Sequence, residues 1–362
     1  MSSTIGDKIK MTIFGESHGP AIGIVLDGLP AGIELDMAAI KREMARRAPG
    51  KNAFSTARAE KDAVEIQSGF FQGKTTGMAL CGLIHNSDAH SKDYSLLKEV
   101  MRPSHGDYPG YVKFKGCNDY RGGGSFSGRL TAPLVFAGAV AKQILAQYNI
   151  TVGAHIAQIG QVQDRAFNYL GESKDVLEKL STETLPTLAS EAASKMAAAI
   201  LAAAEQKNSV GGIVECMVMG VPVGLGEPYF DSVESKLAHM LFSVPAVKGV
   251  EFGKGFALSA MLGSEANDQL EFTEAGVKSI TNNNGGIQGG ITNGMPLVVR
   301  VGIKPTPSIG LPQQTINIVK KENTLLEITG RHDPCIVQRA VVVIEAVTAW
   351  TILDLLLQEK RG

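Results

Sequence analysis

Two segments of the chain are apolar around almost their whole circumference when they are read with the period of an α-helix. Residues 132–147 combine small and aliphatic side chains, and residues 341–357 are interrupted by few polar residues, Glu345 and Asp354 among them. A helix that is apolar on all sides belongs in the interior of a fold, and the charged interruptions argue against a membrane span. The pattern therefore predicts two buried helices, over 132–147 and 334–358.

Shorter amphipathic and alternating segments fill the rest of the chain. Residues 37–47 place Ile40 and Met44 on one helical face, and Asp36 precedes them as a favourable N-cap. Strands and helices interleave without a regular βαβ series, and no Pro/Ser-rich linker divides the chain, so we predict one domain over 1–362. Further helices are predicted over 192–206 and 232–242, and strands over 22–27, 63–67, 78–84, 209–219 and 295–304.

Two glycine-rich stretches show no periodicity. Residues 102–129 are rich in glycine and charged residues, and residues 282–294 contain five glycines. Irregular segments of this length inside a compact protein are usually functional. Each predicted central helix follows a segment that pairs arginine with glycine, at 121–124 and 330–333, which is a weak hint of an internal two-fold repeat.

Composition and charge exclude several classes of function. The chain has 362 residues, 44% of them hydrophobic, and 35 basic residues nearly balance 36 acidic ones, for a net charge of −1. Such a chain has no general attraction for nucleic acid or for an anionic membrane, so an anion must be bound by a local basic cluster. The first residues lack the apolar run of a secretory signal, and the four cysteines lie far apart without metal-binding spacing. We therefore expect a cytoplasmic protein without a metal site.

Two of the seven histidines occur in the same tripeptide, Ser-His-Gly. His18 and His105 each stand in a glycine-flanked loop, where side chains face ligands more often than cores. A single loop histidine is usually a surface residue, but a matched pair favours function. We expect the two imidazoles to act either as acid/base groups or as phosphate contacts.

Arginines gather in the same glycine-rich segments. Arg102, Arg129 and Arg331 lie within them, and Arg47 lies at the end of a predicted helix. Guanidinium groups bind carboxylates and phosphates through two parallel hydrogen bonds, although most arginines are simply solvated. The glycine context favours an anion site, and the glycines at 122–124 allow backbone amides to approach the anion ahead of a helix.

Two further segments carry candidate chemistry. Lys304-Pro-Thr-Pro-Ser308 offers one ammonium and two hydroxyls on a chain stiffened by proline, which suits either a phosphate or a surface turn. Asp333 precedes Pro334 at the predicted start of the last helix, a combination typical of an N-cap and a first helical position. Two interpretations stay open: Asp333 is only the cap of this helix, or backbone amides and the helix dipole keep its carboxylate ionised, as a proton acceptor requires.

Several short motifs resemble those of other enzyme classes. Residues 15–19 match G-x-S-x-G, the nucleophile elbow of serine hydrolases, but the elbow needs a helix after Ser17, where the pattern predicts a strand. Residues 69–75 have too few residues between their glycines for a Walker loop, and no G-x-G-x-x-G follows a strand. His85 and His90 lack the spacing of a helical metal pair. Two rival functions stay open: a serine hydrolase, and a non-catalytic protein that binds an anionic ligand.

Eight segments, in order along nearly the whole chain, resemble those of chorismate synthases. One such segment alone is a weak signal, but eight in order are specific to a family. The first are Phe14-Gly-Glu-Ser-His-Gly19 and Arg102-Pro-Ser-His-Gly-Asp107, and the last are Lys304-Pro-Thr-Pro-Ser308 and Gly330-Arg-His-Asp-Pro-Cys335. Between them lie Asp119-Tyr-Arg-Gly-Gly-Gly124, Gly226-Glu-Pro-Tyr-Phe-Asp231, Ala246-Val-Lys-Gly-Val-Glu251 and Gly285-Gly-Ile-Gln-Gly-Gly290.

The resemblance implies a fold, a reaction and a cofactor. The implied fold is of the α+β class, a β-α-β sandwich around central buried helices, usually assembled as a homotetramer. The implied enzyme is a lyase of the shikimate pathway, which leads to the aromatic amino acids. It removes phosphate from 5-enolpyruvylshikimate-3-phosphate by a trans-1,4 elimination that gives chorismate. Reduced FMN is the implied cofactor; it lends electron density as phosphate leaves and recovers it, so no net redox change occurs.

The resemblance also implies roles for individual residues. His18 is implied to protonate the leaving phosphate, His105 to support the protonation state of the flavin, and Asp333 to relay the substrate proton through flavin N5. The implied substrate-binding residues are Arg47, Arg102, Arg129 and Arg331. The implied FMN-binding residues are Ser125, Phe126, Ser127, Ala246, Gly289, Lys304, Pro305, Thr306, Pro307, Ser308 and, again, Arg331.

The chain departs from the family pattern at several positions. Ser125 and Phe126 stand where many relatives have arginine and serine, Pro245 where asparagine is frequent, and Ala53 where an additional arginine is common. These differences concern the binding of flavin and of pyridine nucleotide (NADP) and leave the reaction class untouched. Because one cation expected for NADPH is missing, we expect that NADPH alone does not sustain turnover, and we consider a separate flavin reductase as a partner.

Overall fold

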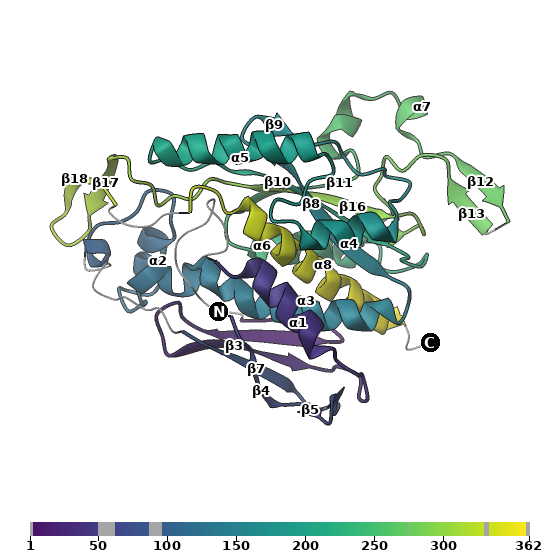
Figure 1. Cartoon of the computed structure of the whole chain (residues 1–362), viewed down its shortest axis with the longest axis horizontal. Coiled ribbons are helices and arrows are strands. Elements are labelled where there is room, and N and C mark those ends of the chain that lie inside the picture. The colour runs from purple at the N-terminus through teal and green to yellow at the C-terminus, as the bar shows by residue number, and fades with distance from the viewer. Residues whose placement is uncertain (1–2, 50–61, 87–95, 275, 329–332, 360–362) are drawn as a thin grey trace.

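The first sheet is built from the N-terminal part of the chain. The computed structural model describes residues 3–49, 62–86, 96–274, 276–328 and 333–359. Five antiparallel strands lie in the order β1-β2-β3-β7-β4, at the lower side of the molecule in Figure 1. In β3, Ile22, Ile24 and Leu26 belong to the core, as the period of two in a half-buried strand requires. The strands are β1 (Thr4–Ile5), β2 (Lys10–Gly15), β3 (Ala21–Asp27), β4 (Glu65–Ser68) and β7 (Leu80–His85).

A second antiparallel sheet lies on the other side of the central helices, with five strands in the order β11-β16-β10-β8-β9. Alternate residues of β10 point to opposite faces of this sheet and pack in two different hydrophobic cores. Val214 and Cys216 belong to the central core, whereas Met217 packs with Leu177 of an outer helix. The outer helices α4 (Lys174–Thr182) and α5 (Ser190–Glu205) cover this sheet from outside. The strands are β8 (Thr151–Ile159), β9 (Val162–Gln163), β10 (Gly212–Met219), β11 (Val247–Phe252) and β16 (Leu297–Ile303).

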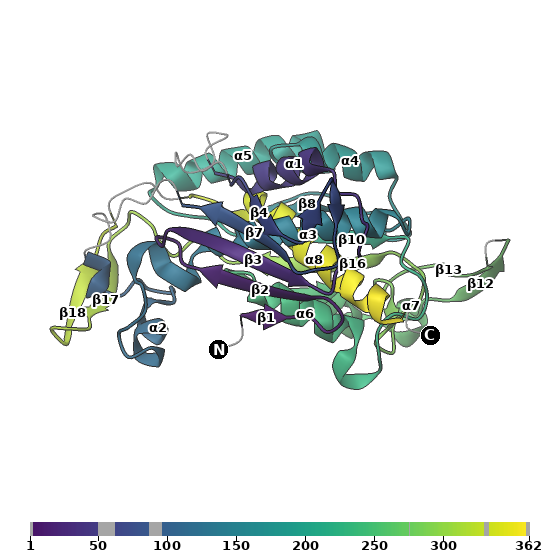
Figure 2. The same ribbon diagram turned by 90° about the horizontal axis from the view of Figure 1, so that it is seen from below.

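Two helices fill the space between the sheets. α3 (Thr131–Ala146) and α8 (Val337–Glu359) pack closely, because a Cβ atom on Gly138 would lie only 2.2 Å from Cα of Ala346. α1 (Met37–Arg47) and α6 (Val233–Ser243) flank this pair, and Figure 2 shows α3 and α8 behind the first sheet. The predicted β-α-β sandwich is confirmed. The central core contains side chains of both sheets.

Buried charges hold the helix layer together. Glu345 of α8 accepts hydrogen bonds from Nη2 of Arg46 at 2.8 Å and from Nζ of Lys142 at 2.5 Å. Burial alone would raise the pKa of Glu345, but these cations outweigh it and hold that pKa well below its usual range. α8 has the length and composition of a membrane span, yet 94% of its most apolar window is buried inside the protein. It is the buried core helix that the sequence predicts.

The first and last residues of the predicted helices and strands differ from the observed ones by at most three positions. Other differences concern the glycine-rich region and elements that the sequence pattern did not reveal. Residues 102–129, predicted to lack regular structure, contain the short helix α2 (Asp107–Lys113). Several elements were not predicted, among them β2, β8, β11 and α4. α8 begins at Val337 and not at Pro334. The remaining elements are β5 (Phe70–Phe71), β6 (Lys74–Thr75), η2 (Leu96–Lys98), η3 (Arg121–Phe126), η4 (Gly128–Leu130), η5 (Tyr229–Asp231), η6 (Gly255–Ala260), α7 (Gly263–Ala266), β12 (Leu270–Thr273), β13 (Gly276–Ser279), β14 (Ile287–Gln288), β15 (Ile291–Thr292), β17 (Gln313–Asn317) and β18 (Glu322–Leu326).

Candidate functional site

A cavity of about 610 Å³ opens where α1 ends and where α3 and α8 begin. Residues from the segments 102–106, 122–131, 242–248 and 304–308 form its wall, together with Asp333 and the first turns of α8. Segments that the sequence singled out, although far apart along the chain, therefore converge on one cavity.

The glycine turn of η3 stands between the two predicted histidines. Gly122 and Gly123 have φ angles of 57° and 87°, in the left-handed region that favours glycine. A Cβ atom on Gly122 would lie 2.1 Å from Cε1 of His18, and one on Gly123 would lie 3.1 Å from Cε1 of His105. The absence of side chains in this turn therefore lets the rings of both histidines approach it closely.

His105 is held by a carboxylate that also binds an arginine. Nδ1 of His105 lies 2.6 Å from Oδ1 of Asp107, and Nε and Nη2 of Arg102 donate to the same carboxylate at 2.7 and 2.8 Å. Burial alone would raise the pKa of Asp107, but the hydrogen bonds from Arg102 and His105 outweigh it and hold that pKa well below its usual range. An ionised carboxylate accepts a hydrogen bond from Nδ1–H, so Nε2 is the ring atom left to exchange a proton.

His18 lies beside the cavity and is not itself part of the wall. Its ring is buried next to the wall residue Gly122, and its Nδ1 lies 3.1 Å from Oγ of Ser17. β3 begins at Ala21 directly after this loop, all of which the structure describes, so a strand and not a helix follows Ser17. The geometry of a serine-hydrolase elbow is therefore not formed, as the sequence pattern predicts.

Arg47 and Arg129 share one buried carboxylate. Nη1 of Arg47 lies 2.8 Å from Oδ2 of Asp62, and Nη1 of Arg129 donates to Oδ1 of the same residue. Burial alone would raise the pKa of Asp62, but the two guanidinium groups outweigh it and lower that pKa. Arg47 also donates to Oγ1 of Thr131 and to the carbonyl of Gly128, at 3.1 and 2.9 Å. Both arginines therefore line the cavity in fixed orientations.

Asp333 does not cap α8, so the interpretation of this residue as an N-cap was wrong. The carbonyl of Pro334 accepts a hydrogen bond from the amide of Val210 at 2.8 Å, and the first helical carbonyl is that of Ile336. This hydrogen bond to Val210, just before β10, thus keeps residues 333–336 out of the helix. Oδ2 of Asp333 lies instead 2.8 Å from Nη1 of Arg339 in the first turn of α8, and both residues line the cavity.

The segment 304–308 lines the cavity except at Pro305. Nζ of Lys304 donates to the carbonyl of Ser104 at 2.5 Å, which leaves two of its three N–H groups for a ligand. Burial and the neighbouring Lys248, also on the wall, lower the pKa of Lys304. Because two adjacent ammonium groups repel each other, a bound anion would relieve that repulsion.

The other implied cofactor residues divide into two groups. Residues 125–127 and Ala246 line the cavity, and the ring of Phe126 packs against α2 across the glycines at 106 and 110. Gly289 is exposed on the turn between β14 and β15 and is not part of the cavity wall. The structure therefore does not place it with the other implied FMN-binding residues. Arg331 lies outside the described residues.

The cavity is strongly cationic. Asp333 is the single acidic residue on the part of the wall that the structure describes, and Asp62 and Asp107 lie behind the arginines. In the described part of the chain, the wall carries six basic side chains, whereas only these three carboxylates lie on it or behind its arginines. This excess of positive charge favours a ligand with several negative charges. Among the described residues, no cluster of His, Cys, Asp and Glu side chains is arranged to hold a metal ion. The basic wall residues are Arg47, Arg102, Arg129, Arg339, Lys248 and Lys304.

Comparison with known proteins decides the family. A family model described as chorismate synthase matches residues 9–357, a range that includes all eight of the family-like segments. The chain belongs to the chorismate synthase family.

Individual chorismate synthases match over nearly their whole length. One from Dehalococcoides mccartyi is 45% identical over 360 residues, which cover 99% of this chain and 97% of that protein. One from Methanocaldococcus jannaschii is 45% identical over 367 residues, again covering 99% and 97%. A solved structure described as "Crystal Structure of Chorismate Synthase" has a TM-score of 0.78 and 29% identity, covering 99% of this chain and 94% of that one. The family, fold and chorismate synthase function that the eight segments predict are confirmed.

Sequence reasoning missed some residues of this chorismate synthase cavity. Asp107 and Lys248 lie inside two of the family-like segments, and that position was the available signal. Asp62 and Arg339 lie outside those segments, so no local pattern marked them. The roles of the individual catalytic, substrate-binding and cofactor-binding residues stay predictions.

Proposed function

We propose that the chain is a carbon–oxygen lyase that eliminates phosphate from 5-enolpyruvylshikimate-3-phosphate in a trans-1,4 sense, using reduced FMN without net redox change. The observation that carries this proposal is the cationic cavity with a histidine on each side of its glycine turn. The substrate has two carboxylates and a phosphate, and a wall with excess positive charge suits such an anion. Membership of the chorismate synthase family supports the same reaction.

In this proposal Arg47, Arg102 and Arg129, together with Arg331, bind the acidic groups of the substrate. The first three guanidinium groups are already fixed by a carboxylate behind them. A fixed guanidinium loses little conformational freedom when an anion binds, so this part of the cavity is preorganised for the substrate.

The cavity also suits FMN. Its volume of about 610 Å³ lies within the range of roughly 300–1,000 Å³ that is usual for ligand sites. Lys248 and the segment 304–308 supply cations and hydroxyls for the flavin phosphate, and residues 125–127 add two more hydroxyls. When bound, reduced FMN supplies an electron-rich ring that assists the departure of phosphate. Because Ser125 replaces a family arginine, the two lysines carry most of the attraction for the flavin phosphate.

Three side chains move protons in the proposed reaction. His18, whose ring adjoins Gly122 of the cavity wall, protonates the departing phosphate. His105 exchanges its proton through Nε2, since Nδ1 is bound to Asp107. Asp333 presents a carboxylate on the wall and is the final acceptor of the proton that the substrate ring loses.

The test is an anaerobic incubation of the protein with reduced FMN and 5-enolpyruvylshikimate-3-phosphate, in which chorismate absorbance and released phosphate are both measured. Chorismate and phosphate are expected in equal amounts. Phosphate without chorismate, together with labelling of Ser17 by a fluorophosphonate, would favour a hydrolase. Binding of FMN without either product would favour a non-catalytic flavin-binding protein.

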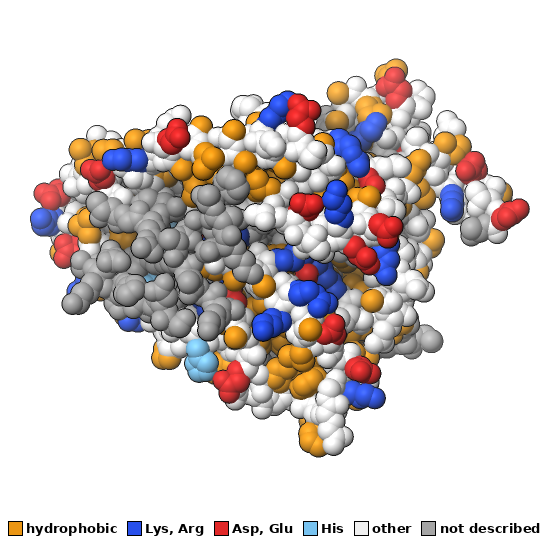
Figure 3. Space-filling view, in the orientation of Figure 1, with side chains coloured by type: hydrophobic (Ala, Val, Ile, Leu, Met, Phe, Trp, Pro, Cys, Tyr) orange, Lys and Arg blue, Asp and Glu red, His pale blue; other side chains and the backbone are white. Residues whose placement is uncertain are grey.

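We further propose a cytoplasmic homotetramer that receives reduced flavin from a separate reductase. The β12–β13 hairpin projects from the body of the protein (Figure 1), and Phe272 on it is 91% exposed, which suits contact with another copy. Acidic and basic side chains are interspersed over the described part of the face in Figure 3, so this face has no general attraction for nucleic acid or an anionic membrane. Sedimentation velocity distinguishes a tetramer from a monomer.

A further inference from the structure

Arg339 lies between two groups of the candidate site. It belongs to the first turn of α8 and lines the cavity. Its Nη1 donates to Oδ2 of Asp333 at 2.8 Å, and its Nε donates to the main-chain carbonyl of Arg47 at 3.0 Å. The side chains of Arg339 and Asp333 are 18% and 15% exposed, so their ion pair is largely shielded from water.

Arg339 thereby joins elements that come from opposite ends of the sequence. Arg47 is the last residue of α1, and the terminal carbonyls of a helix have no partner within the helix. Asp333 lies in the non-helical segment before α8, where its main-chain carbonyl accepts a hydrogen bond from Oγ1 of Thr306 at 2.8 Å. One guanidinium thus connects the end of α1 and the segment of Asp333 to the start of a buried helix.

We propose that Arg339 is a positioning residue that orients the carboxylate of Asp333 for proton transfer. This inference rests on the proposed function, in which Asp333 accepts the substrate proton. A planar guanidinium that is fixed through Nε presents its Nη1 donor at one place, so it selects one orientation of the carboxylate. Without Arg339 the carboxylate can turn away, and a displacement of about 1 Å at a reacting group can cost about a hundredfold in rate.

Direct binding of the substrate is the alternative role for Arg339, because its side chain also lines the cavity. Protein oxygens already accept from both Nε and Nη1, and this favours positioning. The two roles differ in their kinetic effects. An arginine that binds the substrate contributes to substrate affinity, whereas one that orients the proton acceptor contributes to kcat.

A double-mutant cycle between Arg339→Met and Asp333→Asn tests the proposal. Arg339→Met is expected to lower kcat about ten- to a hundredfold. Substrate affinity, measured by calorimetry, should change by less than about threefold. In the Asp333→Asn background the same substitution should have almost no further effect, because no proton acceptor is left to orient. Arg339→Lys should restore part of kcat, since an ammonium keeps one hydrogen bond to Asp333.

Arg42→Met is the matched control. Arg42 lies on the exposed face of α1, with a side chain that is 70% exposed, and its substitution should leave kcat and Tm unchanged. If Arg339→Met does not fold, Arg339→Gln and Arg339→Lys complete the same cycle with Asp333→Asn. Multiplicative effects of the two substitutions, or a loss confined to substrate affinity, would overturn the positioning role. A wild-type protein that forms no chorismate would refute the proposed function instead, so the two failures are distinguishable.

Discussion

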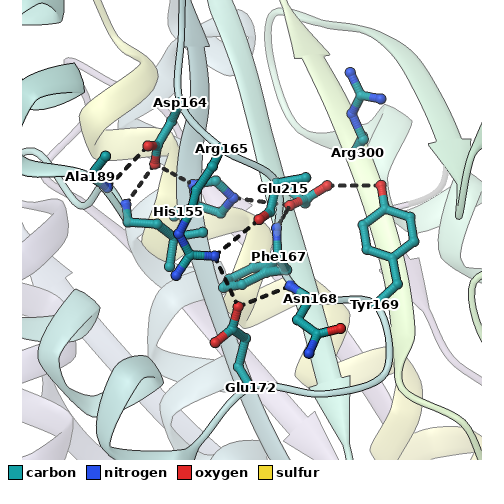
Figure 4. A network of polar contacts seen from close by, with 12 residues as sticks. His155, Asp164, Arg165, Phe167, Asn168, Tyr169, Glu172, Ala189, Glu215 and Arg300 are labelled. Carbon is teal, nitrogen blue, oxygen red and sulfur yellow. Dashed lines mark hydrogen bonds and ion pairs between the residues drawn. The ribbon is translucent and has the colours of Figure 1, made fainter.

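Replacing His155 by glutamine should destabilise the protein most at neutral to acidic pH and least at alkaline pH. His155 of β8 is fully buried between two carboxylates (Figure 4), with Nδ1 3.1 Å from Oδ2 of Asp164 and Nε2 3.0 Å from Oε2 of Glu215. Because each ring nitrogen faces a carboxylate, we infer that each carries a proton and that the buried ring is an imidazolium.

The direction of the pH dependence follows from the pKa of His155, which is raised. Burial alone would lower it, but the hydrogen bonds to Asp164 and Glu215 outweigh burial. A raised pKa contributes stability that is fully present below the unfolded value of about 6.5 and is lost as pH rises through the folded value. Asp164 behaves oppositely: burial alone would raise its pKa, but His155 lowers it, so its contribution is lost as pH falls through the folded value.

The size of the effect follows from the two carboxylates. Glu215 also accepts from the amide of Phe167 at 2.7 Å and from the hydroxyl of Tyr169 at 3.0 Å, so it stays fixed in place. Glutamine can donate to only one of the carboxylates, and a buried charge that loses its partner costs about 3–5 kcal/mol. Unfolding entropy of about 2.1 cal/mol/K per residue, applied to 362 residues, converts this cost to a fall in Tm of about 4–7 °C.

Scanning calorimetry of wild type and His155→Gln, at equal protein concentration and at about pH 6 and about pH 9, measures the effect on either side of the unfolded pKa. His239→Gln, at an exposed position on α6, is the matched control and should leave Tm unchanged at both pH values. A difference in Tm that is equal at both pH values, or larger at the higher one, would refute the assignment of a buried imidazolium.

Further predictions concern the site itself. His18→Ala should lower turnover about a hundredfold or more, and Asp333→Asn should also slow it, with FMN affinity nearly unchanged; wild-type turnover in both variants would leave these residues with structural roles only. Lys304→Ala should weaken FMN binding, followed by flavin fluorescence, about ten- to a hundredfold. Riboflavin, which lacks the phosphate, should bind both proteins alike, and an equal loss for both flavins would show that Lys304 does not hold the phosphate. NADPH and FMN alone should not sustain turnover; steady aerobic chorismate formation without a reductase would contradict this.

The central helices were predictable because a helix that is apolar on all sides, but interrupted by charged residues such as Glu345 and Asp354, belongs in the interior of a fold and not in a membrane. The repeated tripeptide also predicted that His18 and His105 serve one site. The way in which both rings approach the same turn was not predictable, since it depends on the left-handed backbone at Gly122 and Gly123 and on contacts between distant segments. The family was predicted from the order of the eight segments along the chain, because no single local pattern is specific enough to identify it.

Tertiary contacts explain what sequence reasoning missed. A carboxylate before a proline is typical of an N-cap, but the carbonyl of Pro334 accepts a hydrogen bond from the amide of Val210, and the helix begins only after this residue. The carboxylate of Asp333 binds the guanidinium of Arg339 and does not cap the helix. The short helix α2 contains proline and glycine, so its propensity is low, and the ion pair of Asp107 with Arg102 helps to hold it in place. The bond between Val210 and Pro334 joins segments that lie far apart in the chain, so it cannot be read from a local pattern.

Chorismate formation with reduced FMN, compared with oxidised FMN under the same anaerobic conditions, tests most directly whether the cationic cavity is the site of a flavin-dependent elimination. We predict chorismate and phosphate in equal amounts with reduced FMN, no chorismate with oxidised FMN, and a flavin spectrum that is the same before and after many turnovers. Equal rates with the two redox states, or flavin oxidation in step with product formation, would contradict the proposed function.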